Sequence, residues 1–247
     1  MKKTFLIFLS IVVLSCSNND DSTQNSNPNQ LFLKQINKNG LISSKYLYQN
    51  ELVSSREYYD SGELWRTETL EYSGNTISIN SYNSSGELTQ IRKYYAISES
   101  TFRRDRYNSN NELTNYRIHT FSDNNCGFVS IGFYNNNDVL TSTNTFQYFD
   151  DNCSMESINF DSNNEIVFTE EWIRDDKNQY RKNEILDFFR ADNLGNTTIF
   201  NRWDSQNNIE TEYSYESSFE YNTYDYPISE QRNYLNGTSD EFTYEYY

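Results

Sequence analysis

Aromatic and aliphatic residues recur along this chain in a regular pattern with polar turns. Short segments of alternating apolar and polar residues end in Tyr, Phe or Trp, and a cluster of Asn, Asp, Ser or Gly follows. Residues 107–113, for example, read Tyr-Asn-Ser-Asn-Asn-Glu-Leu: an aromatic residue, a turn, and the aliphatic residue that opens the next strand. Because Asn, Asp and Gly tolerate a positive φ angle, these clusters predict hairpin turns.

The turns repeat along the chain with a period of about 25 residues. Related turns follow Tyr59, Tyr82, Tyr107, Tyr134 and Phe160, which lie 23, 25, 27 and 26 residues apart. A second set of turns lies between them, so that a strand ends about every 12 residues, and a fixed period of this kind indicates an array of repeated units.

Alternation within the strands gives each of them two distinct faces. One face of residues 113–121 carries Leu113, Asn115, Arg117, His119 and Phe121, and the other carries Thr114, Tyr116, Ile118 and Thr120. No segment of ten or more residues has a clear helical period. We therefore expect an all-β fold, an antiparallel meander of repeated β-hairpins with roughly 14 to 17 strands that forms a large twisted or curved sheet array.

The N-terminus differs from the rest of the chain. Lys2 and Lys3 precede an apolar segment, residues 4–14, that is too short to span a bilayer of about 30 Å. The following Val13-Leu14-Ser15-Cys16 resembles the lipobox of bacterial lipoproteins. This resemblance implies cleavage before Cys16 and acylation of its thiol and amino group, so that the lipid holds the protein on a membrane. The alternative is an ordinary secretory signal with an unrelated cysteine.

The residues after Cys16 bear on location. Residues 17–22, Ser-Asn-Asn-Asp-Asp-Ser, are similar to the acidic export signal of Bacteroidota-type surface lipoproteins, which implies an outer-membrane lipoprotein exposed at the cell surface. Residues 17–30 contain no large apolar side chain and should stay disordered. We expect a signal peptide over 1–15, a lipidated cysteine and tether over 16–30, and a single β-repeat domain over 31–247.

The turn sequences also resemble known repeats. Residues 82–89, Tyr-Asn-Ser-Ser-Gly-Glu-Leu-Thr, resemble the YD repeat of RHS-type surface proteins, and residues 58–64 resemble a MORN-variant repeat. The C-terminal residues 221–247 look like the end of Bacteroidota lipoproteins built from such hairpins. These resemblances imply a hairpin array, and none of them brings a catalytic residue within the repeat.

Composition excludes some partners. The formal charge is -16, and it becomes -18 when Lys2 and Lys3 leave with the signal. An acidic surface of this size repels phosphate backbones, which argues against nucleic acid as a partner. Aromatic residues make up 17% of the chain and all hydrophobic residues 35%, so about half of the hydrophobic residues are aromatic. This composition is typical of strands whose faces are partly exposed to solvent.

Residues with catalytic or metal-binding chemistry are few. The single histidine, His119, lies in a predicted strand without the spacing of a zinc site, so we interpret it as a half-buried sheet residue. The acidic pairs at 150–151, 170–171 and 175–176 are candidates for the catalytic carboxyl groups of a glycosidase. Such an enzyme requires two carboxyl groups that face one cleft. Adjacent acids in turns are more typically solvated, and the spaced ligands of a calcium loop are absent from the sequence. We expect no enzyme activity, metal or cofactor.

Cys126 and Cys153 remain once Cys16 is lipidated. They lie in corresponding turns one repeat apart, and an even pair in an oxidising compartment favours a disulfide. The two strands involved are separated by about 9.5 Å, so the turns must lean together to bring the Cα atoms to about 5.5 Å.

Three hypotheses for function follow. The first is a non-catalytic surface lipoprotein that acts as a binding or structural module for a glycan or a surface protein. The second is a glycan-binding accessory of a polysaccharide-uptake system, with Trp65, Trp172 and Trp203 as candidate stacking platforms. The third is a carboxylate-based hydrolase, which needs a deep pocket with two facing acids.

Overall fold

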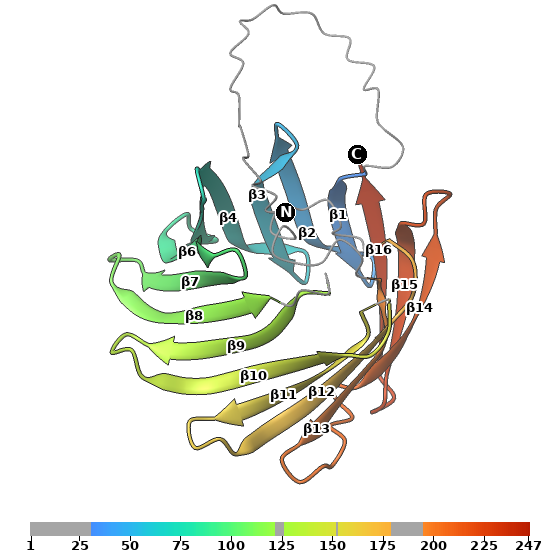
Figure 1. The fold of residues 1–247 in the computed structure, drawn as a ribbon. Coiled ribbons are helices and arrows are strands. Elements are labelled where there is room, and N and C mark those ends of the chain that lie inside the picture. The colour runs from blue at the N-terminus through green and yellow to red at the C-terminus, as the bar shows by residue number, and fades with distance from the viewer. Residues whose placement is uncertain (1–30, 122–125, 152, 179–194) are drawn as a thin grey trace, which may run out of the picture.

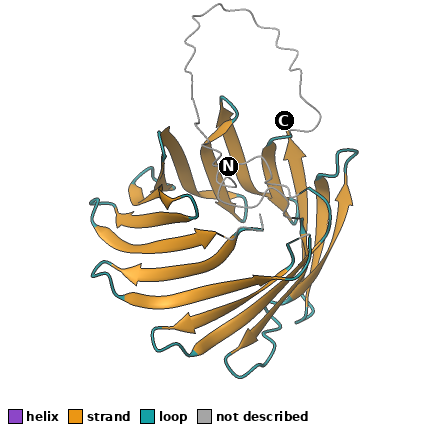
Figure 2. Cartoon of the chain, in the orientation of Figure 1, coloured by secondary structure: helices purple, strands orange, loops and turns teal. Residues whose placement is uncertain are grey.

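The fold consists of β-strands and their connections. The computed structural model describes residues 31–121, 126–151, 153–178 and 195–247, so the predicted signal peptide, Cys16 and the tether lie outside the described residues. Figure 2 shows strands joined by loops, and the described residues contain no helix long and apolar enough to cross a membrane.

The strands follow one another in an antiparallel meander. They are β1 (Leu33–Lys38), β2 (Leu41–Gln49), β3 (Leu52–Asp60), β4 (Glu63–Ser73), β5 (Thr76–Asn83), β6 (Leu88–Ser98), β7 (Thr101–Asn108), β8 (Leu113–Phe121), β9 (Phe128–Asn135), β10 (Leu140–Tyr148), β11 (Met155–Asp161), β12 (Ile166–Arg174), β13 (Thr197–Asp204), β14 (Tyr215–Tyr221), β15 (Pro227–Tyr234) and β16 (Ser239–Tyr246). Each strand pairs with its neighbours in sequence, as the hairpin pattern predicts.

The sheet closes on itself, so the prediction of a large twisted or curved sheet array is wrong. β1 pairs with β16, with Ile36 opposite Tyr244, and the result is a closed barrel (Figure 1). The backbone N–H of Tyr247 also donates to the carbonyl of Phe32 at 2.9 Å. An open sheet leaves a row of unpaired backbone groups on each edge strand, and closure pairs those groups.

The repeated turns have a common geometry. In the β7–β8 turn, the Asn108 side-chain oxygen accepts hydrogen bonds from the backbone N–H groups of Asn110 and Glu112, each at 3.0 Å, and Asn111 has φ 62°. The same Asx turn begins at Asn83, Asn135, Asp161, Asp204 and Asn222. The positive φ falls on Gly86 in the first of these turns and on Asn or Asp in the others, so an Asx residue replaces glycine without loss of the hairpin.

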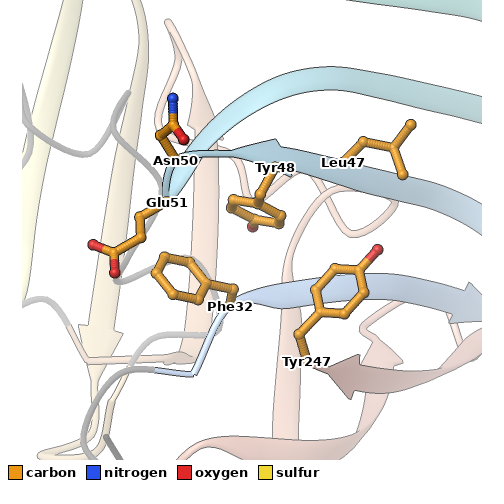
Figure 3. Close-up of a pocket in the computed structure, with 6 residues that line it drawn as sticks. All are labelled: Phe32, Leu47, Tyr48, Asn50, Glu51 and Tyr247. Atoms are coloured by element: carbon orange, nitrogen blue, oxygen red, sulfur yellow. The ribbon is translucent and has the colours of Figure 1, made fainter. Parts of the chain in front are cut away.

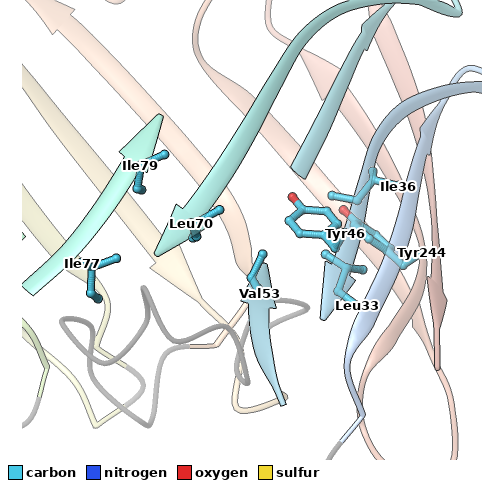
Figure 4. Close-up of a cluster of buried hydrophobic side chains, with 8 residues drawn as sticks. All are labelled: Leu33, Ile36, Tyr46, Val53, Leu70, Ile77, Ile79 and Tyr244. Carbon is cyan, nitrogen blue, oxygen red and sulfur yellow. The ribbon is translucent and has the colours of Figure 1, made fainter. Parts of the chain in front are cut away.

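On most strands one face of the barrel sheet is more buried than the other, although Asp105 and Tyr116 are buried on the opposite face of β7 and β8. On β14, Tyr215, Ser217, Phe219 and Tyr221 are half-buried, whereas the alternate residues are exposed. A closed barrel crowds side chains on its concave side, so the buried set marks the inner face. A cluster of eight buried side chains converges there from β1–β5 and β16 (Figure 4): Leu33, Ile36, Tyr46, Val53, Leu70, Ile77, Ile79 and Tyr244.

The outer face is polar and charged. Its positions include Lys45, Glu57 and Thr67, which follow one another in the register of β2, β3 and β4. On β14 the outer residues Glu216 and Glu220 are exposed. Exposed aliphatic side chains occur among these polar residues, as on the water-facing surface of most proteins.

Candidate functional site

A pocket on the inner face is the candidate site, and we call it the Trp172 pocket. It has a volume of about 360 Å³, within the range of small-ligand sites. Its lining comes from β9–β13 and the adjoining turns: Cys126, Gly127, Phe128, Ile131, Phe146, Tyr148, Met155, Trp172, Arg174 and Thr197. The register brings Met155 between Tyr148 and Trp172, so residues distant in sequence form one surface.

Aromatic rings make up much of this surface. Trp172 packs against Phe200 with ring centroids 5.2 Å apart, and Phe128 lies 6.4 Å from Phe146. Burial raises the pKa of Tyr148, which keeps its hydroxyl neutral. Such an array offers flat apolar faces with a polar hydroxyl and a guanidinium at its edge, which suits an uncharged ring carrying hydroxyl groups.

A disulfide holds one end of the Trp172 pocket. It joins Cys126, in the connection before β9, to Cys153, in the turn before β11, with Cα atoms 5.3 Å apart. This is the pair that the repeat spacing predicts. The Arg174 side chain donates a hydrogen bond to the carbonyl of Cys153 at 2.6 Å, and the Arg174 N–H donates to Ser154 Oγ at 2.9 Å. The disulfide therefore fixes the turns that position Arg174.

The structure does not bring the three tryptophans together into one platform. Trp172 lines the inner pocket, but Trp203 lies opposite Thr169 on the outer face of β13. Trp65 is the extra residue at a bulge in β4 and is 48% exposed, with its ring 6.3 Å from that of Tyr58. Only Trp172 of the three lies in the pocket.

A second hollow of about 360 Å³ lies at the seam of the barrel (Figure 3). Phe32, Leu47, Tyr48, Asn50, Glu51 and Tyr247 line it. The Tyr48 ring lies 5.1 Å from Phe32 and 6.0 Å from Tyr247, and the Tyr247 hydroxyl donates to the carbonyl of Tyr46 at 3.3 Å. These contacts tie the C-terminus to β1 and β2, so we assign this hollow to closure of the barrel.

Buried carboxylates on the inner face were not predicted from the sequence. Glu68 is 1% exposed and forms ion pairs with Arg56, Arg66 and Arg92. Glu230, 2% exposed, accepts hydrogen bonds from Arg232 and from Ser217 at 2.7 Å. The signal in the sequence is a charged residue at an inward position of β4 and β15, but sequence alone does not identify its partners.

The acidic pairs do not form a catalytic dyad. Glu170 faces inward toward Arg202 at 3.5 Å, and Glu171 is on the opposite face, where it accepts a hydrogen bond from Asn201. Asp150 accepts from the N–H of Ser154 within its own turn. Asp175 accepts hydrogen bonds from backbone N–H groups and from the Tyr221 hydroxyl, while the Asp176 side chain is exposed. In the part of the chain that the structure describes, no group of His, Cys, Asp and Glu is arranged to hold a metal ion.

Comparison with known proteins gives a likeness in fold. No protein-family profile matches this chain, and no curated protein matches it. Among solved structures, a porin-like protein from Bacteroides uniformis is similar, with a TM-score of 0.55 and 11% sequence identity. The match covers 83% of this chain and 89% of that chain. The chain therefore has a porin-like closed β-barrel fold, and at this identity the likeness concerns the fold alone.

Proposed function

We propose that this protein is a non-catalytic binding barrel that is held at the outer membrane by a lipid on Cys16 and displayed at the cell surface. The observation that carries the proposal is the Trp172 pocket, which combines a ligand-sized volume with aromatic rings on the concave side of the barrel. The second hypothesis, a glycan-binding accessory, is supported by the same rings, because sugar rings pack their apolar faces on aromatic side chains.

The outer face supports a barrel that stands in water beside the membrane. Outer-face charges such as Lys45, Glu57 and Glu216 lie at positions that would face lipid tails in a membrane-spanning barrel. A lysine or arginine on the lipid face costs about 2–4 kcal/mol at the bilayer midplane. The lipid on Cys16, ahead of the first strand, then supplies the attachment.

The arrangement of acids supports a binding role over hydrolysis. A glycosidase needs two carboxyl groups about 5–10 Å apart that face one cleft. Glu170 and Glu171 point to opposite faces, and Asp175 is occupied by hydrogen bonds. Arg174 is the charged residue that lines the Trp172 pocket.

A glycan-array screen of the mature protein tests the proposal. We expect saccharides to bind, and we expect Trp172→Ala to weaken their binding at least tenfold because the ring that stacks on the sugar is lost. Trp203→Ala is the matched control, since Trp203 lies on the outer face of the neighbouring strand and should leave binding unchanged. Equal loss in both variants, or no saccharide bound at all, contradicts the proposal.

A further inference from the structure

Four cationic or titratable side chains gather on the inner face of β7 and β8, and we call them the basic patch: Arg104, Arg106, Arg117 and His119. Arg104 lies directly opposite Arg117 in the register, and Arg106 lies opposite Arg92 on β6. Like charges in such cross-strand positions repel each other. In a chain with a formal charge of -16, this concentration of positive charge is unusual.

The arginines of the basic patch lack the carboxylate partners that Arg92, Arg202 and Arg232 have on the same face. Elsewhere on this face, Arg92 pairs with Glu68, Arg202 with Glu170 and Glu210, and Arg232 with Glu230. Within residues 31–121, 126–151, 153–178 and 195–247, no ion pair or hydrogen bond engages the guanidinium group of Arg104, Arg106 or Arg117. The Arg117 guanidinium lies over the Phe133 ring at 4.3 Å, which orients it without neutralising it.

His119 adds a buried and unsatisfied group to this patch. It is 6% exposed, and both ring nitrogens are buried without a hydrogen-bond partner among the described residues. Its ring stacks on Phe102 with centroids 4.2 Å apart. Nε of Arg104 is also buried and without a partner. Buried polar groups are normally hydrogen-bonded, so the imidazole and the Arg104 guanidinium leave hydrogen-bonding capacity unused on this face.

The electrostatic effects on these side chains agree with the geometry. Burial, followed by the charge of Arg104, lowers the pKa of Arg117 to about 10. Burial, with Arg104 and Arg117, lowers the pKa of His119 to about 3. A bound anion would favour the charged forms and so oppose both burial and repulsion, the causes of these shifts.

The basic patch adjoins the Trp172 pocket. Ile131, which lines the pocket, is the register partner of His119, and the ring of Phe128, another lining residue, lies 5.0 Å from the His119 ring. A ligand with its ring in the pocket can therefore extend a substituent over β9 toward β8. The two surfaces form one continuous inner wall.

We propose that the basic patch binds the carboxylate or sulfate groups of an acidic saccharide whose ring occupies the Trp172 pocket. Arginine presents a planar fork of donors that matches the two oxygens of a carboxylate or sulfate. The saccharide part rests on the proposed function, whereas anion binding by the patch is tested separately.

The first test uses inorganic sulfate and the full mature chain. Sulfate should raise the thermal unfolding midpoint by a few degrees relative to chloride at the same ionic strength, because it binds the folded state. In Arg104→Gln/Arg117→Gln this increase should disappear. The matched control is Lys45→Gln/Lys93→Gln, which removes the same charge from the outer face and should keep the increase. Arg117→Lys, which keeps the charge but loses the planar fork, gives a second and milder variant with a partial loss.

The second test compares a tetragalacturonate, a sulfated tetrasaccharide and a neutral cellotetraose by calorimetry. At least one acidic ligand should bind ten or more times tighter than the neutral one, and Arg104→Gln/Arg117→Gln should remove that difference. The acidic ligand that binds more tightly shows whether the basic patch prefers carboxylate or sulfate groups. Sulfate protection that persists in the double variant, or neutral and acidic saccharides of equal affinity, overturns the proposal. Sulfate protection without any saccharide binding counts against the proposed saccharide function and leaves the anion site in place.

Discussion

Arg92 on β6 forms an ion pair with Glu68 on β4, although β5 lies between their strands. Adjacent strands are about 4.8 Å apart, so the two residues belong to strands separated by nearly 10 Å. They meet because side chains on the concave face of a closed barrel lean toward one another. Arg56 and Arg66 approach the same carboxylate, each at 3.5 Å, which makes Glu68 the centre of a buried charge network.

Glu68→Gln should destabilise the barrel strongly. The change leaves Arg56, Arg66 and Arg92 without their shared anion, and breaking a buried ion pair costs about 3–5 kcal/mol. Urea unfolding measures the loss. Glu71→Gln, an exposed outer-face change on the same strand, should alter stability by less than about 0.5 kcal/mol. Equal effects of the two substitutions would show that Glu68 is not the centre of the network.

Removing the disulfide should weaken the fold without preventing it. The bond closes a loop between residues separated by 27 positions, and the chain-entropy estimate for such a loop is about 3–4 kcal/mol. Cys126→Ser/Cys153→Ser should lower the unfolding midpoint by roughly 10 °C. Intact-mass analysis with and without alkylation checks the covalent state. Two free thiols in the unreduced native protein would contradict the pairing.

His119 should make stability fall in mildly acidic buffer. Burial and the neighbouring Arg104 and Arg117 lower its folded pKa to about 3, below the ordinary value of 6.5. The unfolded state then binds the extra proton, so the stabilisation is present above pH 6.5 and is lost as the pH falls toward 3. Between pH 7 and pH 5 the loss should be about 2 kcal/mol.

Chemical unfolding in chloride buffer across that range measures the effect. His119→Gln is the control, because the chain has a single histidine and the variant should lose this part of the pH dependence. An unchanged profile in the variant would assign the pH dependence to other groups.

Lipidation should depend on Cys16. Labelling of growing cells with a fatty-acid analogue is expected to mark the wild-type protein, because the lipobox-like residues 13–16 direct acylation to this thiol. Cys16→Ala should carry no label, whereas Cys126→Ala retains it. Labelling of the Cys16→Ala variant at the wild-type level would rule out the anchor.

Surface display should make the barrel accessible from outside the cell. Protease added to intact cells is expected to remove the protein, with a periplasmic protein as the control for cell integrity. Protection in whole cells and digestion only after lysis would place the barrel in the periplasm.

Local features of this fold were predictable from sequence because their causes are local. Asn108 caps backbone N–H groups only two and four residues away, so the turn is encoded within its own segment. The alternation of residues 113–121 likewise assigned Arg117 and His119 to one face of the strand and Tyr116 and Ile118 to the other. The register of β7 and β8 agrees with this assignment. The equivalent positions of Cys126 and Cys153 in the repeat identified the disulfide pair.

Closure and the candidate site depended on tertiary structure. Twist accumulates over all the strands, and whether the first meets the last depends on tilt and register around the whole sheet, not on any one repeat. The hydrogen bond from Gln35 to Glu245 spans 210 residues, a relationship that no local pattern contains. Closure decided that Trp172 faces inward and Trp203 outward. The β7–β8 hairpin sets Arg104 opposite Arg117, and closure placed this pair on the crowded concave face, where the lack of a carboxylate partner becomes significant.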